Sequence, residues 1–485
     1  MKKAELMFIP FPAASHIVSM VEIAKLLTHR YPHLSATVLI IHSPFPSMTD
    51  SYIKSISAAS TGTGGIKFLN LPPPQQTPDD PPAYKSSDDL VSPSIPKVRA
   101  AVAELSASPG SAPVAGFVVD LICTLMMDLA KELGLPSYVF VPSGAAFLGL
   151  VLHFQTLRDD HHRDVTEFTN SDAELVIPCF ANPVPARVLP SFMVDKDGAS
   201  TAILNSAKRL RESKGILVNT CVELESNTIN TLNTNIGIDG TPPIYPVGPI
   251  LNLTDDAQKG SSIMSAQKGS SIMSWLDDQP PSSVVFLCFG SMGSFSTNQV
   301  REIALALELS GRRFLWSLRM PPPSTVKNNI GFPTDYDNPE EVLPKGFLER
   351  TAGIGKVIGW APQVAVLAHR AVGGFVSHCG WNSILESMWY GVPIATWPMY
   401  AEQQLNAFVI ARELGLGVEI KIDYKDNGDL VNANEIERGI RGVMEGDEVI
   451  RKNVKEMREK IRKALTRDGS SYVSFGQFVQ QMMCD

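Results

Sequence analysis

Short, continuous runs of apolar residues alternate with amphipathic stretches along most of this chain. A run of this kind bounded by turn residues predicts a buried strand of a parallel sheet, and an amphipathic stretch predicts a helix. Strands are predicted at residues 5–10, 36–41, 66–71, 114–120, 137–141, 214–220, 283–289, 312–317, 355–359, 373–378, 393–397 and 415–420. The repeated order of strand and helix predicts the α/β class with parallel sheets.

The helices predicted between these strands are at residues 17–27, 123–133, 144–172, 221–232, 297–310, 382–390, 403–414, 434–444, 449–465 and 472–483. A chain of 485 residues exceeds what one hydrophobic core usually holds, so two domains are expected. The predicted divisions are an N-terminal domain at 1–245, a linker at 246–274, a second domain at 275–465 and a C-terminal helix at 466–485 that packs back on the first domain.

The predicted linker contains a perfect tandem repeat. The segment Ala257–Ser265 recurs without change at Ala266–Ser274. A repeat architecture needs more than two units, and the entropy of loop closure rises only slowly with length. We therefore interpret the repeat as a duplicated, mobile linker without chemistry.

The charge balance excludes a nucleic-acid partner. Asp and Glu outnumber Lys and Arg by 50 to 42, which gives a formal net charge of -8, and phosphates would be repelled. No run approaches the roughly 18 apolar residues that a membrane helix needs. Pro10 and Pro12 interrupt the N-terminal apolar run too early for a signal peptide. The six cysteines lack paired spacing, which predicts a cytoplasmic protein without structural zinc.

One stretch, from Trp360 to Gln403, concentrates the candidate chemistry. Within it, the apolar run at 373–378 is followed by a short helix at 382–390. A helix that opens directly after a buried strand presents free backbone donors and a partial positive charge, which favours a phosphate ligand. The polar side chains around this point are His378, Asn382 and Ser383.

Other residues of this stretch fit the rest of a nucleotide sugar. Glu386 lies one turn beyond Asn382, where its carboxylate suits two vicinal ribose hydroxyls. Trp360 offers a flat ring beside a rigid turn, which suits base stacking. Glu402 and Gln403 follow a predicted strand and offer an acceptor and an amide to sugar hydroxyls. We therefore interpret the stretch as a nucleotide-sugar site.

Over its whole length the stretch resembles the signature box of plant UDP-dependent glycosyltransferases that act on small molecules. An ordinary α/β segment with a polar turn would explain its glycines and helix end, but not all of its polar residues together. The resemblance implies a GT-B fold, with two Rossmann-like domains whose parallel sheets face a central cleft. It also implies that Trp360 stacks on uracil and Glu386 binds ribose. The implied donor-binding residues are Ser291, Trp360, Ala361, Gln363, His378, Trp381, Asn382, Ser383, Glu386, Glu402 and Gln403.

The N-terminal domain carries a candidate catalytic pair. His16 and Asp120 each follow a predicted strand at the same sheet edge, and a carboxylate beside an imidazole fixes its tautomer. On the residues alone, a lone histidine at this place is more often a helix cap than a catalyst, and the alternative for Asp120 is that it merely caps the following helix. The resemblance implies that His16 is the general base and Asp120 orients it. Relatives carry glycines before this histidine, where the present chain has Ala13, Ala14 and Ser15.

The acceptor side is less distinctive. Phe147, Phe192 and Met193 are candidate walls of an acceptor pocket, although core packing is the commoner fate of such side chains. Two Asp-x-Asp triplets, at 195–197 and 335–337, do not follow a predicted strand beside the phosphate site. We interpret both triplets as solvated loop charges and expect no metal.

Together these features predict an inverting, UDP-glucose-dependent glucosyltransferase that makes β-O-glucosides of small lipophilic acceptors such as flavonoids or other plant phenols. UDP-glucose is then a co-substrate, no cofactor is expected, and the protein is expected to be a monomer. A nucleotide-sugar epimerase and a non-catalytic nucleotide-sugar-binding protein of the same fold are the alternatives. Relatives with Gln at position 403 use glucose, and an amide that donates and accepts suits two neighbouring equatorial hydroxyls. UDP-glucose is therefore expected over UDP-galactose.

Overall fold

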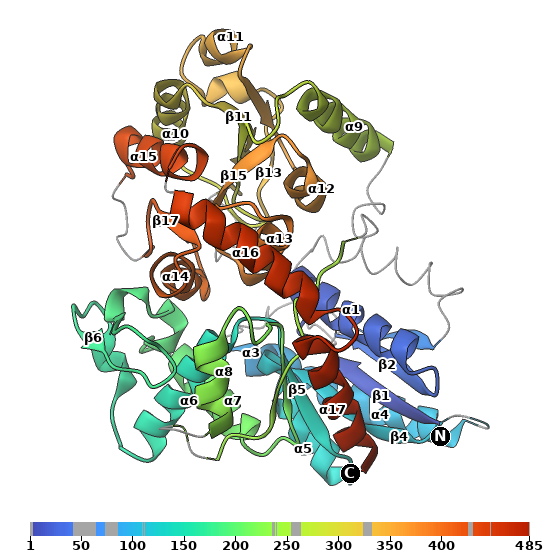
Figure 1. Cartoon of the computed structure of the whole chain (residues 1–485). Coiled ribbons are helices and arrows are strands. Elements are labelled where there is room, and N and C mark those ends of the chain that lie inside the picture. The colour runs from blue at the N-terminus through green and yellow to red at the C-terminus, as the bar shows by residue number, and fades with distance from the viewer. Residues whose placement is uncertain are drawn as a thin grey trace. The chain divides into compact units, whose positions relative to one another are not determined.

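The computed structural model describes residues 3–41, 65–72, 86–108, 110, 112–234, 238, 240–253, 263–323, 332–424, 430–446 and 448–484, with the side chains of all of these except 263–268. The chain divides into two compact units, and each is described by itself (Figure 1). The first unit comprises Met1–Ala186, Ser191–Gly260 and Lys463–Asp485, and the second comprises Arg187–Pro190 and Ser261–Arg462.

The first unit is built on a seven-stranded sheet in which all neighbouring strands are parallel. In spatial order its strands are β3 (Ile66–Asn70), β2 (Leu34–Ile40), β1 (Ala4–Ile9), β4 (Val114–Asp120), β5 (Ser137–Val141), β8 (Ile216–Val218) and β9 (Ile244–Pro246). The chain begins in the middle of the sheet, builds one edge, and then crosses back, so the strand order reverses between β1 and β4.

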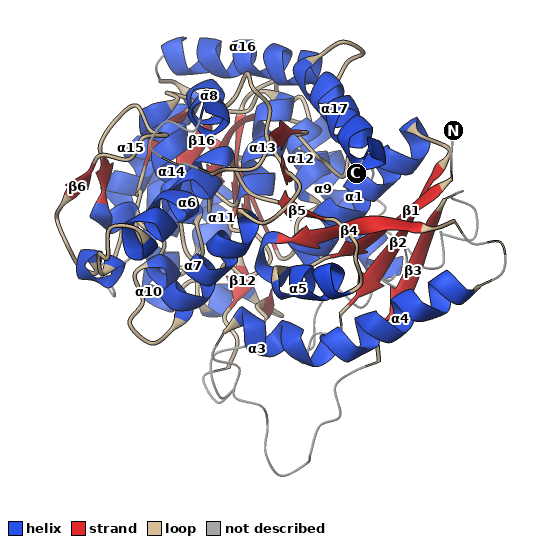
Figure 2. Cartoon of the chain, turned by 90° about the horizontal axis from the view of Figure 1, so that it is seen from below, coloured by secondary structure: helices blue, strands red, loops and turns tan. Residues whose placement is uncertain are grey.

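Helices cover both faces of this sheet. They are α1 (Ala14–Arg30), α3 (Ser87–Val91), α4 (Ile95–Ala107), α5 (Leu125–Glu132), α6 (Ala145–Asp159), α7 (Ala199–Leu210), α8 (Ser226–Thr234) and α17 (Ser470–Cys484). Figure 2 shows α1 and α17 on one face and α4 and α5 on the other. Phe478 of α17 packs edge-on against Tyr138 and Tyr245, with ring centroids 5.2 Å and 5.7 Å away. The last helix of the sequence therefore completes the core of the first sheet.

The second unit repeats the same plan with a six-stranded parallel sheet. In spatial order its strands are β14 (Gly355–Ile358), β11 (Arg313–Ser317), β10 (Val284–Cys288), β15 (Val372–Ser377), β16 (Ile394–Thr396) and β17 (Gly417–Glu419). Phe286 and Phe375 are register partners on the two central strands, and their rings stack at 5.3 Å. The strand order reverses here too, between β10 and β15.

The helices of the second unit are α9 (Ile263–Asp277), α10 (Thr297–Ser310), α11 (Phe347–Thr351), α12 (Gln363–Ala368), α13 (Trp381–Tyr390), α14 (Gln403–Phe408), α15 (Ala433–Met444) and most of α16 (Glu448–Ala464). A small antiparallel pair, β12 (Arg319–Met320) and β13 (Thr334–Asp335), follows the end of β11. α13 ends at Tyr390, and its C-cap Gly391 adopts φ 74, in the left-handed region that favours glycine.

Three predicted helices differ from the structure. The helix expected at 144–172 ends at Asp159, and three residues later His162 adopts φ 52, which a continuing helix does not allow. The helix expected at 403–414 changes to a π-helix over Val409–Glu413. The helix expected at 221–232 begins only at Ser226, after a turn.

The duplicated segment also differs from its prediction. The chain was expected to stay an irregular linker up to residue 274, but it becomes helical at Ile263. The second copy of the repeat lies within α9, where Ile272 is only 3% exposed, and burial of this side chain favours the helix. Residues 257–262 of the first copy lie outside the described residues.

No helix in the described ranges is both long enough and apolar enough to span a bilayer.

The packing of α17 gives a stability prediction. Phe478→Ala should lower the free energy of unfolding by about 3–5 kcal/mol, because it empties a fully buried aromatic site. Val473→Ala on the same helix is the matched control, since Val473 is 44% exposed and its truncation should cost less than about 0.5 kcal/mol. Urea unfolding measures both values. Equal small effects would show that α17 contributes little to the first core.

Candidate active site

A tight turn connects β15 to α13 at the point where the strand order of the second sheet reverses. The Cys379 amide donates to Ser377 Oγ at 3.1 Å, and Asn406 of α14 donates through Nδ2 to the Cys379 carbonyl at 3.1 Å. These bonds hold Cys379 in the left-handed region, with φ 61. The first-turn backbone donors of α13, which lack partners within the helix, therefore open beside His378.

The His378 ring packs directly against the backbone of two glycines, Gly290 and Gly380. A Cβ at either Gly290 or Gly380 would stand 2.6 Å from His378 Nε2, so neither position has room for a side chain. Burial lowers the pKa of His378 to about 4, although a hydrogen bond with the Cys288 backbone opposes this shift. His378 is therefore neutral near pH 7. Its buried Nδ1 has no hydrogen-bond partner among the residues that the structure describes.

Gln363 joins two of the predicted donor-binding side chains. Its Nε2 donates to Ser383 Oγ at 2.8 Å and to Glu386 Oε2 at 2.7 Å. Burial raises the pKa of the Glu386 carboxyl to about 7, and the Gln363 hydrogen bond partly opposes this rise. The structure thus brings the first residue of α12 together with one face of α13, around a carboxyl group that titrates near neutral pH.

The remaining residues of the predicted donor site vary in exposure. Trp360 is half-buried just before α12, Asn382 is half-buried in the first turn of α13, and Ser291 is exposed. Ala361 is buried. Trp381 is 3% exposed, so this residue is buried within the second unit.

Gln403 stabilises the turn that carries Glu402. Its Oε1 accepts hydrogen bonds from the amides of Met399, at 3.0 Å, and Tyr400, at 3.1 Å. The turn thus already uses this oxygen, and Nε2 is the group able to donate to a ligand. The rings of Tyr400 and His378 lie 6.2 Å apart, so this turn neighbours the start of α13.

In the first unit, His16 and Asp120 meet where that sheet reverses its order. His16 Nδ1 lies 2.8 Å from Asp120 Oδ2, and Asp120 has no exposed surface while the His16 side chain is 22% exposed. The other carboxylate oxygen, Oδ1, accepts from the Ile122 amide at 3.0 Å. Asp120 thus both caps the following turn and binds the imidazole of His16. Helix capping and contact with His16, which the sequence offered as alternatives, therefore occur together.

Of the three residues proposed from the sequence to line an acceptor pocket, two contact each other and one is fully buried. Phe147 and Phe192 contact each other edge-on at 6.1 Å, and Phe192 is half-buried. Met193 has no exposed surface, so it packs in the core, which was the alternative weighed from the sequence.

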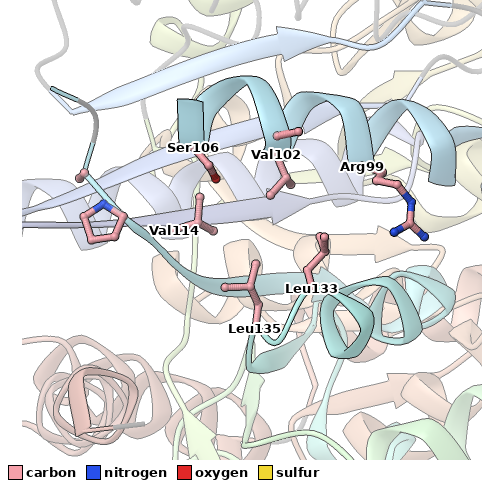
Figure 3. A pocket seen from close by; sticks show the side chains of 9 residues that line it. Arg99, Val102, Ser106, Val114, Leu133 and Leu135 are labelled. Atoms are coloured by element: carbon pink, nitrogen blue, oxygen red, sulfur yellow. The ribbon is translucent and has the colours of Figure 1, made fainter. Parts of the chain in front are cut away.

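A surface pocket of the first unit lies elsewhere. Figure 3 shows that Val102 and Arg99 of α4, Val114 at the start of β4, and Leu133 and Leu135 line it. Val114 and Asp120 are the two ends of β4, and a strand of this length spans roughly 20 Å. This pocket is therefore at the opposite sheet edge from the His16–Asp120 pair.

Sequence reasoning missed several residues that hold the site. Asn406 lies three residues beyond Gln403 on one helix, and that spacing is a signal that places both amides on one face. Asp335 accepts from the Trp360 amide at 2.9 Å. In the first unit, Asp195 accepts from the Ala199 amide at 2.9 Å, a contact with the start of α7 and not with a predicted site residue. The interpretation of both Asp-x-Asp triplets as solvated loop charges is therefore wrong for these two carboxylates, since backbone amides bind them.

The two units now define a class of protein. Each has a parallel sheet of the Rossmann order, one with a buried carboxylate on an imidazole and the other with a phosphate-type helix start beside a carboxyl group. This combination is that of GT-B glycosyltransferases, which use nucleotide sugars.

The comparisons name the family. Residues 245–460 match the model of the family described as "UDP-glucoronosyl and UDP-glucosyl transferase". A UDP-glucose flavonoid 3-O-glucosyltransferase 6 of Fragaria ananassa is 55% identical over 488 residues, which cover 99% of each chain. The chain belongs to this family, and it is a UDP-glycosyltransferase.

Solved structures agree along the whole chain. A UGT transferase from Siraitia grosvenorii, in complex with UDP, matches with a TM-score of 0.87 and 44% identity, covering 99% of this chain and 100% of that one. UGT71G1 of Medicago truncatula, complexed with UDP-glucose, matches with a TM-score of 0.84 and 42% identity, covering 99% and 98%. The GT-B fold is thereby established.

Donor affinity should depend on the ionisation of Glu386. Its carboxylate accepts from two ribose hydroxyls with a full negative charge, whereas protonation removes that charge and makes one oxygen a donor, so binding should weaken as the pH falls through the pKa of about 7. His378, with a pKa of about 4, and Tyr400, with a pKa of about 12, do not titrate in this range. Calorimetry with UDP-glucose should show about tenfold weaker binding for each pH unit below the pKa of Glu386.

Two variants sharpen this measurement. Glu386→Gln should bind UDP-glucose weakly and without pH dependence. Gln363→Ala should move the midpoint to higher pH, because the Gln363 hydrogen bond lowers the pKa of Glu386. A donor affinity that stays constant through neutral pH in the unaltered protein would contradict the assignment.

Proposed function

We propose that this chain is an inverting glucosyltransferase that transfers glucose from UDP-glucose to a hydroxyl of a small aromatic acceptor of the flavonoid or phenol class. The 2.8 Å pair of His16 and Asp120 at the reversal of the first sheet carries the proposal. The name of the Fragaria relative supports the acceptor class, and the UDP-glucose complex of the Medicago structure supports the donor.

His16 acts as the general base in this proposal. Because Asp120 accepts from Nδ1–H, the basic lone pair is on Nε2, and the proton of the acceptor hydroxyl moves there. The acceptor oxygen forms a bond to the anomeric carbon while the bond between that carbon and the diphosphate oxygen breaks. Attack opposite to the leaving UDP converts an α-linked donor into a β-glucoside. The buried carboxylate stabilises the imidazolium that results.

The second unit stabilises the leaving group in this proposal. Because His378 is neutral near pH 7, the charge of the diphosphate is balanced mainly by the first-turn amides and dipole of α13. Glu386 and Gln363 bind the ribose, and Trp360 stacks on the base. Glu402 and the Nε2 group of Gln403 bind the glucose hydroxyls.

The two alternative functions, a nucleotide-sugar epimerase and a non-catalytic nucleotide-sugar-binding protein, do not require the His16–Asp120 pair of the first unit. An epimerase needs no second substrate, and a binding protein needs no base. Neither accounts for a fully buried carboxylate that binds a partly exposed imidazole. Phe147 and Phe192, which lie close to each other in the same unit, are the proposed acceptor walls.

Removal of the base gives the first test of this function. His16→Ala should lower kcat with an unactivated phenol by roughly 10²–10⁴-fold, because the acceptor proton then has no positioned base. The Kd of UDP-glucose should stay near that of the unaltered enzyme, since the proposed donor residues belong to the other unit. His29→Ala is the matched control, because His29 is an exposed histidine on the same helix. Full turnover by His16→Ala would refute the assignment.

The sugar preference gives the second test. UDP-glucose should be preferred over UDP-galactose by roughly ten- to a hundredfold, because an axial hydroxyl leaves a buried donor unpaired. Gln403→Glu keeps an oxygen for the Met399 and Tyr400 amides and removes the Nε2 donor. This variant should lose most of the preference, mainly through slower glucose transfer. Competition between UDP-glucose and UDP-galactose at equal concentration measures the preference. Equal use of both donors by the unaltered enzyme would contradict the prediction.

A further inference from the structure

Side chains from two other strands hold the peptide group that precedes Trp360. Ser317 Oγ, at the end of β11, donates to the Gly359 carbonyl at 2.7 Å. Asp335 Oδ1, in β13, accepts from the Trp360 amide at 2.9 Å. The carbonyl and the amide belong to one planar peptide group, so the plane cannot rotate without breaking one of these bonds.

The Asp335 carboxylate is itself held on two sides. A Cβ at Gly359 would lie 2.2 Å from Asp335 Cγ, so the carboxylate rests directly on the glycine backbone. On the other side, Arg319 Nε lies 3.3 Å from Asp335 Oδ1, and Arg319 is only 8% exposed. The same guanidinium donates to the carbonyls of Pro333 and Thr334. A buried cation with these partners fixes where the carboxylate can stand.

The chain after Trp360 is also constrained. Ala361 is buried, and Pro362 has its φ at -72 as it starts α12. The half-buried ring of Trp360 therefore projects from a backbone that is fixed on both sides. The second unit holds all of these residues, with β11, β13 and α12 in the part of the chain that Figure 1 draws in yellow and orange.

We infer that Asp335, supported by Arg319 and Ser317, is a positioning residue for UDP-glucose, because it sets the direction in which Trp360 presents its ring to the nucleobase. The inference rests on the stacking role proposed for Trp360. Base stacking stabilises the bound ground state and the transition state equally, so a misplaced ring weakens donor binding and leaves the chemical step unchanged.

The first arm of the test is Asp335→Ala. Calorimetry and steady-state kinetics should show that Kd and KM for UDP-glucose rise roughly three- to thirtyfold, a part of what complete loss of base stacking costs. The kcat should stay within about twofold, as expected when only uniform binding is lost. Asp337→Asn is the matched control, since Asp337 is the exposed carboxylate of the same triplet and should leave both constants unchanged.

Asp335→Asn separates the two partners of the carboxylate. Its side-chain oxygen still accepts from the Trp360 amide, so the Kd of UDP-glucose should stay close to that of the unaltered enzyme. The Tm should fall, because the buried Arg319 loses its counter-charge. A structural role alone would lower the Tm of both Asp335 variants and leave both values of KM unchanged, which would overturn the inference.

A double-variant cycle with Trp360→Ala completes the test. Once the ring is gone, Asp335→Ala should add little further loss of donor affinity, whereas additive losses would overturn the inference. If Trp360→Ala leaves the Kd unchanged, the stacking role fails and the inference fails with it. If the unaltered enzyme binds UDP-glucose and transfers no glucose, the proposed function fails, and the binding measurements still decide the role of Asp335.

Discussion

The location of the chemistry depends on one constraint, which is the reversal of strand order in the middle of each parallel sheet. Where the order reverses, the connections after two adjacent strands run to opposite faces of the sheet, which leaves room for ligands at their carboxyl ends. β1 and β4 form this point in the first unit, where His16 and Asp120 follow them. β10 and β15 form it in the second, where Gly290 and His378 follow.

The two histidines show how environment divides the roles of one residue type. His16 is partly exposed and bound to a fully buried carboxylate, which stabilises a positive charge on the ring. His378 is buried between glycines, and burial lowers its pKa to about 4. Corresponding places in two similar sheets thus give one imidazole a buried carboxylate partner and leave the other neutral near pH 7. The roles proposed for them, general base in one unit and neighbour of the diphosphate in the other, follow this difference.

The sequence predicted the features that local order controls and missed those that depend on distant contacts. Apolar runs predicted every strand of the two large sheets except β9, and their ends gave His16, Asp120 and His378. The hydrogen bond from the Trp360 amide to Asp335 was missed because Asp335 is 25 residues upstream. It comes close to Trp360 only because β13 folds beside β12. The use of the Gln403 carbonyl was missed because it depends on the geometry of the preceding turn. Burial of Trp381 likewise follows from packing that no spacing reveals.

The glycines at 290 and 380 set a limit on how this enzyme can be redesigned. Any side chain at either position would collide with the His378 ring, so neither glycine can be replaced without moving this histidine. The turn before α14 is different, because Tyr400 and Glu402 are both only half-buried. Libraries that aim to change the transferred sugar should therefore vary this turn and keep the glycine pair intact. Nucleotide recognition and sugar recognition are then separable engineering targets within one short segment.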